Sequence, residues 1–272
     1  MKNKVKTFKL YVRPDDKSKQ IADTIRDLNL SMLNPLIESE NPDLVIAIGG
    51  DGTFIDAVTQ THFSKDIIYT GFHTGTLGFL QDLCQEDVFS FFKYLNLEDS
   101  IKTRKVYVAF VEVFLKNGSS CNFFALNEVL VAGENYSKIS FAQYINGELF
   151  QNISASGICI ATSTGDTSFS LNAKGAIDFS NNFQLVCTLI APIRNAAHER
   201  FIENSIICSK ITLSLQPSEN ISIIIDGRKK DISPGIIESV KVSMIDDSNY
   251  INKLDIKDYS KVSVVRNKIL GY

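Results

Sequence analysis

The chain has 272 residues, of which 44% are hydrophobic and 22% are charged, and its formal net charge is -3. This length predicts about two domains or one large domain, with enough apolar residues for packed cores. The charge balance argues against nucleic-acid binding, and no apolar run approaches the roughly 20 residues that span a bilayer. The basic start of the chain lacks the apolar core of a signal peptide, so we expect a cytoplasmic protein without membrane partners.

The cysteines predict a reducing compartment. The chain has five of them, widely scattered, and no two form a CxxC pair. No histidine stands near them at metal-ligand spacing. We therefore expect reduced thiols.

The first 95 or so residues alternate between predicted strands and helices. Residues 6–12 are rich in β-forming side chains, and residues 15–30 carry apolar side chains at helical spacing. Residues 43–48 (DLVIAI) form a continuous apolar run that is typical of a central parallel strand. Further elements are expected at residues 53–61 (helix), 67–72 (strand) and 86–95 (helix). This order predicts a doubly wound α/β domain for nucleotides over residues 1–97.

The remainder of the chain shows a strand–turn–strand pattern from residue 102 to about residue 245. Asn117-Gly118, Asn146-Gly147 and Asp226-Gly227 are hairpin signals, because these residues tolerate the positive φ of a tight primed turn. We predict a second, mainly antiparallel, β-sandwich-like domain over residues 98–272. Whether the last stretch, residues 250–272, returns to the first domain is left open.

The most informative segment is the glycine turn, which we define as residues 49–53 (GGDGT). Glycines between a parallel strand and a helix let backbone N–H groups approach a phosphate, and the helix start adds partial positive charge. A carboxylate at this place repels phosphate, so Asp51 needs a separate role, as a proton acceptor or a metal ligand. The alternative is a tight turn in which Asp51 caps the helix. The turn lacks the Lys-Ser/Thr pair of a P-loop and the third glycine of a dinucleotide fingerprint.

The glycine turn and four further segments resemble the NAD kinases, ATP-dependent enzymes that phosphorylate NAD to NADP. GGDGT alone is shared with diacylglycerol kinases, sphingosine kinases and phosphofructokinases. The narrower resemblance rests on residues 71–80 (GFHTGTLGFL), Asn127-Glu128, residues 156–169 (SGICIATSTGDTSF) and Asp226-Gly227. Single segments are weak signals, but their combination and order are specific.

The resemblance implies a reaction and a set of roles for the glycine turn. Asp51 would take the proton of the 2′-hydroxyl of the adenosine ribose, and ATP would donate its γ-phosphoryl group. Mg²⁺ or another divalent metal would arrive with ATP, because no cluster of carboxylates suggests a protein-made metal site. A homodimer or homotetramer is also implied. The phosphate-binding residues would be Gly49, Gly50, Gly52 and Thr53.

The resemblance also implies an NAD pocket. Asn127 would bind an adenine edge and Glu128 a ribose diol; the alternative is a polar pair at a strand bend. Phe79 would pack against the adenine or be an ordinary core residue. Asp226 would be a turn residue that also faces the site, and His73 a phosphate ligand or a half-buried structural histidine. The remaining NAD-binding residues implied are Asp51, Gly52, Ser156, Thr164, Thr167, Ser168, Phe169, Asn172 and Ala191.

Departures from the family pattern keep two other functions open. Ser156, Ser163, Asp166 and Phe169 replace residues that are usual in the family. For Asp166 we expect either a cap on a helix that begins at residue 167, or a carboxylate that weakens NADP binding. The alternatives to an NAD kinase are a lipid kinase of the same superfamily and a dinucleotide-binding sensor that has lost turnover.

Overall fold

The structure is a computed structural model that describes residues 5–75, 78–97, 101–180, 183–194, 200–216, 220–232, 235–244 and 248–271. The chain divides into two compact units, an α/β unit (Met1–Val106 with Tyr250–Tyr272) and a β unit (Tyr107–Asn249). This division lies later in the chain than the expected one at residues 97 and 98. It also groups the C-terminal stretch with the α/β unit.

The α/β unit is built on a mainly parallel sheet. In its described part, six strands lie in the order β2-β1-β3-β4-β17-β5. The pairs β1–β2, β1–β3, β3–β4 and β4–β17 are all parallel. A strand from the end of the chain therefore lies beside β4. The strands are β1 (Thr7–Val12), β2 (Ile37–Glu38), β3 (Leu44–Gly49), β4 (Ile68–His73), β5 (Thr103–Tyr107) and β17 (Tyr250–Leu254).

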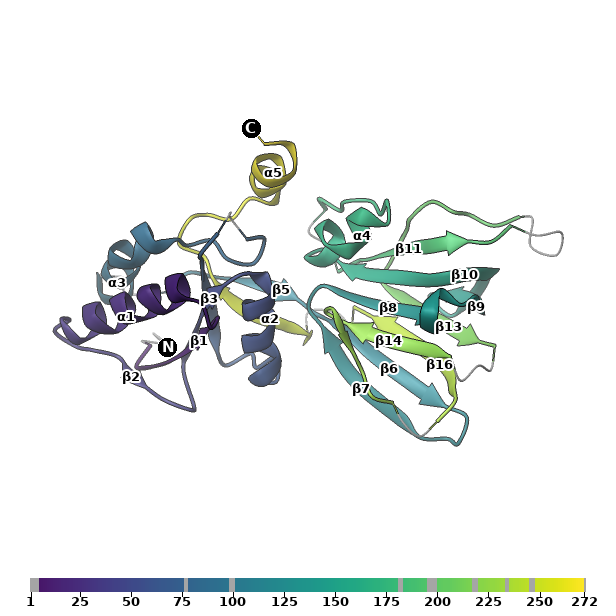
Figure 1. Ribbon diagram of the computed structural model, residues 1–272, viewed down its shortest axis with the longest axis horizontal. Helices are drawn as coiled ribbons and strands as arrows, with labels where there is room; N and C mark the ends of the chain where they lie inside the picture. Colours follow the sequence, from purple (N-terminus) through teal and green to yellow (C-terminus); the bar gives the residue numbers. More distant parts are fainter. Residues whose placement is uncertain are drawn as a thin grey trace. The chain divides into compact units, whose positions relative to one another are not determined.

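Helices cover both faces of this sheet (Figure 1), which confirms the doubly wound prediction. The helices are α1 (Asp16–Leu30), α2 (Asp51–Gln60) and α3 (Val88–Leu97). Phe72 of β4 packs on Phe91 of α3, with ring centroids 5.4 Å apart. Tyr69 of the same strand meets Phe54 of α2 at 6.3 Å. Residues three positions apart on a strand point to opposite faces, so α2 and α3 lie on opposite sides.

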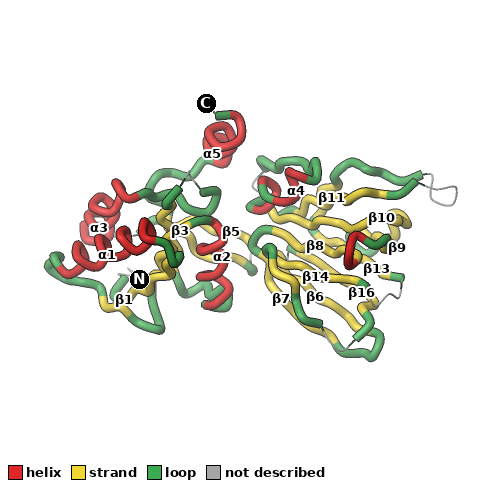
Figure 2. The backbone as a smooth tube through the Cα atoms, viewed as in Figure 1, coloured by secondary structure: helices red, strands yellow, loops and turns green. Residues whose placement is uncertain are grey.

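The β unit is built mainly from strands joined by loops, with a few short helical segments (Figure 2). Its described residues form an 11-stranded sheet in the order β15-β14-β8-β10-β9-β13-β16-β6-β7, with β11 on β10 and β12 on β11. All pairs are antiparallel, which confirms the mainly antiparallel prediction. The strands are β6 (Ala109–Leu115), β7 (Ser120–Ala125), β8 (Glu128–Gly133), β9 (Ile139–Ile145), β10 (Glu148–Thr162), β11 (Leu185–Pro192), β12 (Ile206–Cys208), β13 (Lys210–Leu215), β14 (Ile221–Ile225), β15 (Arg228–Lys229) and β16 (Ile237–Ser243).

The three predicted hairpins are present. Asn117-Gly118 joins β6 to β7, Asn146-Gly147 joins β9 to β10, and Asp226-Gly227 joins β14 to β15. The last turn has positive φ at both residues, 51° at Asp226 and 76° at Gly227. This is the conformation that a two-residue primed turn requires, so the local sequence determines where these strands reverse.

Short helical segments complete the fold. They are η1 (Gln85–Asp87), η2 (Glu134–Tyr136), η3 (Gly165–Thr167), α4 (Phe169–Asn172), α5 (Lys261–Val265) and η5 (Arg266–Leu270), the last of which is a π-helix. Across the described residues, no helix has both the length and the apolar character needed to span a bilayer. The five cysteines are free thiols.

Candidate active site

The glycine turn lies at the carboxyl edge of the α/β sheet, between β3 and α2. Gly49 has a φ of 152°, and a Cβ there would lie 2.6 Å from the Thr53 hydroxyl oxygen, so only glycine fits. Gly52 has the opposite surroundings, because a Cβ there would have no heavy atom within 4 Å. Gly49 thus allows the turn to pack closely against the end of β1 and against α2. Gly52 leaves the outer side of the turn open for a ligand.

Asp51 is fixed by the loop that follows β4. Its carboxylate accepts the backbone N–H of Phe79 at 2.9 Å and that of Leu80 at 3.0 Å. The N-cap of α2 is Gly50, and no side chain makes a capping hydrogen bond at this helix start, so the alternative in which Asp51 caps the helix is wrong. A Cβ at residue 78 would lie 2.3 Å from the Asp51 carboxylate. Gly78 therefore lets the second loop close around Asp51.

Gln81 connects the loop that follows β4 to the glycine turn. Its side chain is fully buried, and its amide donates to the Gly50 carbonyl at 2.7 Å. Gly71 of β4 leaves the space that the Gln81 side chain fills, since a Cβ at residue 71 would lie 2.6 Å from it. We did not predict Gln81 as a site residue, and its only sequence signal was its place directly after the L-G-F-L segment.

Arg13 is a second residue that the sequence analysis did not single out. It follows β1, which pairs in parallel with β3, so it lies at the same edge as the glycine turn. Its guanidinium bonds to the Thr74 hydroxyl at 3.0 Å and to the Asp15 carboxylate at 2.6 Å. The Arg13–Asp15 contact raises the pKa of Arg13 and holds the pKa of Asp15 well below its usual range. A permanent positive charge thus stands beside the turn.

The structure also shows the surroundings of two other predicted residues of this unit, Phe79 and His73. Phe79 is half-buried, and its ring faces the Lys268 ammonium at 4.1 Å. It is therefore not an ordinary core residue. His73 is also half-buried, and its Nδ1 lies 3.0 Å from the Gly75 carbonyl oxygen, which agrees with its structural alternative.

In the β unit, Asn127 and Glu128 lie where β8 begins. They are only 9% and 7% exposed. Within the described part of the chain, the Asn127 Oδ1 and one oxygen of Glu128 have no hydrogen-bond partner. Buried polar atoms without partners cost free energy, and in native structures they commonly mark the place of a ligand or water. This favours a binding role over the alternative of a polar pair at a strand bend.

Asp226 holds this segment in place. From its hairpin, it accepts the backbone N–H groups of Leu126 at 2.9 Å, Asn127 at 2.7 Å and Glu128 at 3.2 Å. Burial raises the pKa of Asp226, and these three N–H groups act in the opposite direction. Its observed role is therefore that of a turn residue that fixes the Asn-Glu pair.

Glu128 has a raised pKa. Its burial, with a smaller contribution from the negative charge of Asp226, raises the pKa to about 7. Hydrogen bonds from the Ser168 hydroxyl and the Phe169 backbone act in the opposite direction. Small changes at this site therefore decide whether the carboxylate is ionised.

The stretch after β10 closes against the Asn-Glu pair. Thr162 is fully buried; its hydroxyl donates to the Leu126 carbonyl at 2.7 Å and accepts the N–H of Thr164 at 3.1 Å. A Cβ at residue 165 would lie 2.0 Å from the Asn127 carbonyl oxygen. Gly165 is therefore required for the two segments to touch. This brings the predicted residues Thr164, Thr167, Ser168, Phe169 and Asn172 onto one short segment, η3 and α4, next to Glu128.

Ser156 and Ala191 form a separate group. They lie opposite each other on β10 and β11, because the residues on either side of them are paired. Ala161, the β10 partner of Glu128, is five positions from Ser156, or roughly 16 Å along a strand. Ala191 has a positive φ of 44°, which is uncommon for a residue with a side chain. These two residues can contact only a different part of an extended ligand.

Asp166 does not cap α4, and that prediction is wrong. The residue before α4 is Ser168, whereas the Asp166 carboxylate is fully buried and accepts the backbone N–H of Asp178 at 2.7 Å. It thus ties the loop after α4 back to η3.

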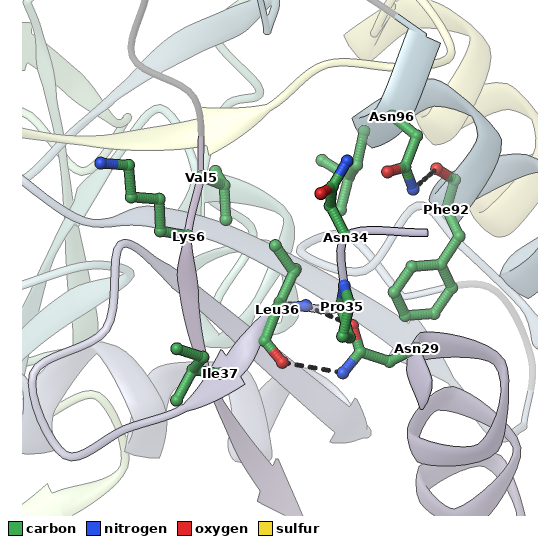
Figure 3. A pocket seen from close by; sticks show the side chains of 10 residues that line it. Val5, Lys6, Asn29, Asn34, Pro35, Leu36, Ile37, Phe92 and Asn96 are labelled. Carbon is green, nitrogen blue, oxygen red and sulfur yellow. Dashed lines mark hydrogen bonds between the residues drawn. The ribbon is translucent and has the colours of Figure 1, made fainter. Parts of the chain in front are cut away.

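A pocket of about 330 Å³ lies at the other edge of the α/β sheet (Figure 3). It is lined where β1 and β2 begin and where α1 and α3 end, and Asn29 bonds to both backbone groups of Leu36 beside it. This pocket lies at the amino ends of the strands, whereas the glycine turn lies at their carboxyl ends. The two are roughly 20 Å apart by the length of a six-residue strand. The lining residues are Val5, Lys6, Asn29, Asn34, Pro35, Leu36, Ile37, Phe92, Leu95 and Asn96.

A glycine-rich turn at the carboxyl ends of parallel strands in a doubly wound sheet is typical of nucleotide-binding proteins. Residues 7–99 match the sequence family described as the ATP-NAD kinase N-terminal domain, and residues 126–254 match the ATP-NAD kinase C-terminal domain. The chain therefore belongs to the NAD kinase family and is a kinase. The lipid-kinase and sensor alternatives are not favoured.

Curated relatives agree with this assignment, and solved structures share the fold. NAD kinase 1 of Oceanobacillus iheyensis is 32% identical over 224 residues, 80% of this chain and 82% of that protein. The NAD kinase of Caldicellulosiruptor bescii is 29% identical over 237 residues, 85% and 84% of the two chains. Yeast NADH kinase complexed with NADH shares the fold with a TM-score of 0.82 and 18% identity, over 99% of this chain and 88% of that one. An Archaeoglobus fulgidus NAD kinase in complex with ATP gives 0.68 and 18%, over 92% and 94%.

Proposed function

We propose that this NAD kinase transfers the γ-phosphoryl group of ATP to the 2′-hydroxyl of the adenosine ribose of NAD, with Asp51 as the base. The ribose oxygen forms a bond to the γ-phosphorus, and the bond from that phosphorus to the β–γ bridging oxygen breaks. ADP leaves, and the ribose proton passes to Asp51 and then to solvent. The observation that carries this role is the fixed carboxylate of Asp51, held at both oxygens beside an open glycine turn.

The phosphate-binding residues we propose are those of the glycine turn, Gly49, Gly50, Gly52 and Thr53. The start of α2 supplies backbone N–H groups and partial positive charge. Among the described residues, no three His, Cys, Asp or Glu side chains cluster as a metal site would require. Mg²⁺ therefore fits this turn as a partner of the triphosphate, where it would neutralise phosphate charge.

For NAD we propose the buried pair as the recognition group. The unpartnered Asn127 Oδ1 would accept a hydrogen bond from the adenine amino group. The unpartnered Glu128 oxygen would accept a hydrogen bond from a ribose hydroxyl. Phe79 would pack against the adenine. The segment from Thr164 to Asn172 would form the wall of this pocket, and Ser156 with Ala191 would meet the nicotinamide end, because they lie farther along β10.

Two broader properties complete the proposal. The free cysteines, with the Cys187 and Cys208 sulfurs 3.8 Å apart and unbonded as a disulfide, support a reducing compartment such as the cytoplasm. A homodimer or homotetramer is proposed from the family resemblance. Light scattering on the purified protein tests the oligomer directly.

A coupled assay tests the proposed reaction. The full chain is incubated with NAD, ATP and Mg²⁺, and NADP is detected with an NADP-specific dehydrogenase. NADP should form in proportion to the enzyme added, and omission of ATP or NAD should abolish it. Consumption of ATP without NADP formation would contradict the proposal.

A further inference from the structure

A lysine from the end of the chain lies beside the glycine turn. Lys268 belongs to η5, in the C-terminal part of the α/β unit. Its ammonium stands 4.1 Å from the centre of the Phe79 ring, and the residue is half-buried. Among the described residues, no carboxylate lies within ion-pair distance of Lys268.

Lys268 and Asp51 are linked through Phe79. The backbone N–H of Phe79 donates to the Asp51 carboxylate, while the ring of the same residue faces the Lys268 ammonium. Burial lowers the pKa of Lys268, and the negative charge of Asp51 partly offsets this effect. The ammonium is therefore close enough to Asp51 to interact electrostatically, but it does not form an ion pair with it.

The glycine turn has no positively charged side chain of its own to bind a triphosphate. The turn contains one carboxylate and no basic residue, although an ATP triphosphate brings several negative charges. Arg13 stands nearby, but its guanidinium already bonds to Asp15 and Thr74. Within the part of the chain that the structure describes, the Lys268 ammonium contacts the Phe79 ring and no carboxylate, and a flexible, partly desolvated ammonium binds phosphate well as a point charge.

We propose that Lys268 binds the triphosphate of ATP at the glycine turn and offsets the repulsion between Asp51 and the phosphates. Its long stem allows the ammonium to leave the Phe79 ring and reach the phosphate oxygens. This inference rests on the proposed function of the turn and adds a residue that is distant from it in the sequence.

The test measures ATP and NAD separately in matched variants of the full chain. Lys268→Gln and Lys268→Met remove the charge, and Lys268→Arg keeps it. Arg266→Gln, an exposed position on the same helix, is the control. The dissociation constant for ATP with Mg²⁺ is measured by calorimetry without NAD, and the Michaelis constants for ATP and NAD are measured by NADP formation.

Removal of the charge should weaken ATP binding tenfold or more and change the Michaelis constant for NAD by less than twofold. Lys268→Arg should recover most of the affinity, and Arg266→Gln should match the unsubstituted chain. Unchanged ATP affinity in both the Gln and Met variants would overturn the proposal, as would equal losses for ATP and NAD or tighter NAD binding alone. If the unsubstituted chain makes no NADP, the proposed reaction fails, whereas the calorimetric ATP measurement still decides the role of Lys268.

Discussion

The two units each hold a carboxylate at their candidate site, and the two carboxylates have opposite surroundings. Asp51 is partly exposed, and backbone N–H groups hold both of its oxygens. Glu128 is buried, has one oxygen without a partner among the described residues, and lies close to a second carboxylate, Asp226. A proton acceptor has to be fixed and accessible, whereas a recognition group gains selectivity from being buried and unsatisfied until its ligand binds. The comparison therefore supports the proposed roles, in which Asp51 carries the chemistry and Glu128 selects NAD.

The largest effect is expected when Asp51 can no longer accept a proton. Asp51→Asn should lower turnover by about 10²-fold or more. An amide has only one acceptor oxygen for the N–H groups of Phe79 and Leu80, so we also expect about 1 kcal/mol of lost stability. Steady-state NADP formation and thermal unfolding check both effects. Asp66→Asn, on an exposed loop, is the matched control, and near-normal turnover in the Asp51 variant would remove Asp51 from the reaction.

The glycine turn could be predicted from sequence, because its residues are contiguous. DLVIAI followed by GGDGT indicated the strand, the turn and the helix, although α2 begins at Asp51 rather than at residue 53. Arg13 and Lys268 could not be found in this way. They reach the turn only because β1 lies beside β3 and because the C-terminal stretch belongs to the α/β unit.

The pocket of the β unit was only partly predictable for the same reason. The Asn-Glu pair, the stretch after β10 and Asp226 were each recognised by resemblance. Their contacts, however, depend on the register of β8 with β10 and with β14. The role of Asp166 was missed because its partner, the backbone N–H of Asp178, carries no side-chain signal in the sequence.

The second effect concerns pH, because the comparison makes Glu128 a source of pH-dependent stability. The pKa of Glu128 is about 7 in the folded protein and about 4.3 in an unfolded chain. The folded state thus holds the proton more tightly than the unfolded state. Its stabilising effect is complete below about pH 4 and is lost as the pH rises to about 7, with a total on the order of 3–4 kcal/mol.

Thermal unfolding between pH 5 and pH 8 measures this effect. Glu128→Gln removes the titrating group, so the variant should gain stability relative to the unsubstituted protein as the pH rises. Glu112→Gln, at a carboxylate that is ion-paired with Lys241, controls for the loss of a negative charge. Parallel pH profiles for the unsubstituted protein and the Glu128 variant would show that Glu128 is not a buried, perturbed acid.

The third effect concerns the close contact between Gly165 and the backbone of Asn127. A Cβ at residue 165 would lie 2.0 Å from the Asn127 carbonyl oxygen. Gly165→Ala should therefore cost about 2 kcal/mol of stability and weaken NAD binding, because Asn127 has to move. Gly75→Ala, where a Cβ would meet nothing within 4 Å, should have little effect on stability. Equal stability of the two variants in denaturant unfolding would contradict the contact.

The smallest effect concerns Asp166. Asp166→Ala removes the acceptor for the Asp178 N–H and should cost about 1–2 kcal/mol, whereas Asp166→Asn keeps an acceptor oxygen and should cost less. Neither variant should change inhibition by NADP, because the carboxylate is fully buried. Thermal unfolding and NADP inhibition of the two variants check this. A large change in NADP inhibition with unchanged stability would show that Asp166 faces the ligand.

The most direct test of the division between chemistry and selection is the dissociation constant for NAD in two variants, measured by calorimetry at pH 8. In Asp51→Asn, NAD should bind within about twofold of the unsubstituted protein despite the loss of turnover. In Glu128→Gln, NAD binding should weaken by roughly 1–3 kcal/mol, the scale of a charged hydrogen bond lost in a buried site, while ATP binding changes less. Normal NAD affinity in the Glu128 variant, or a comparable loss in the Asp51 variant, would contradict the account.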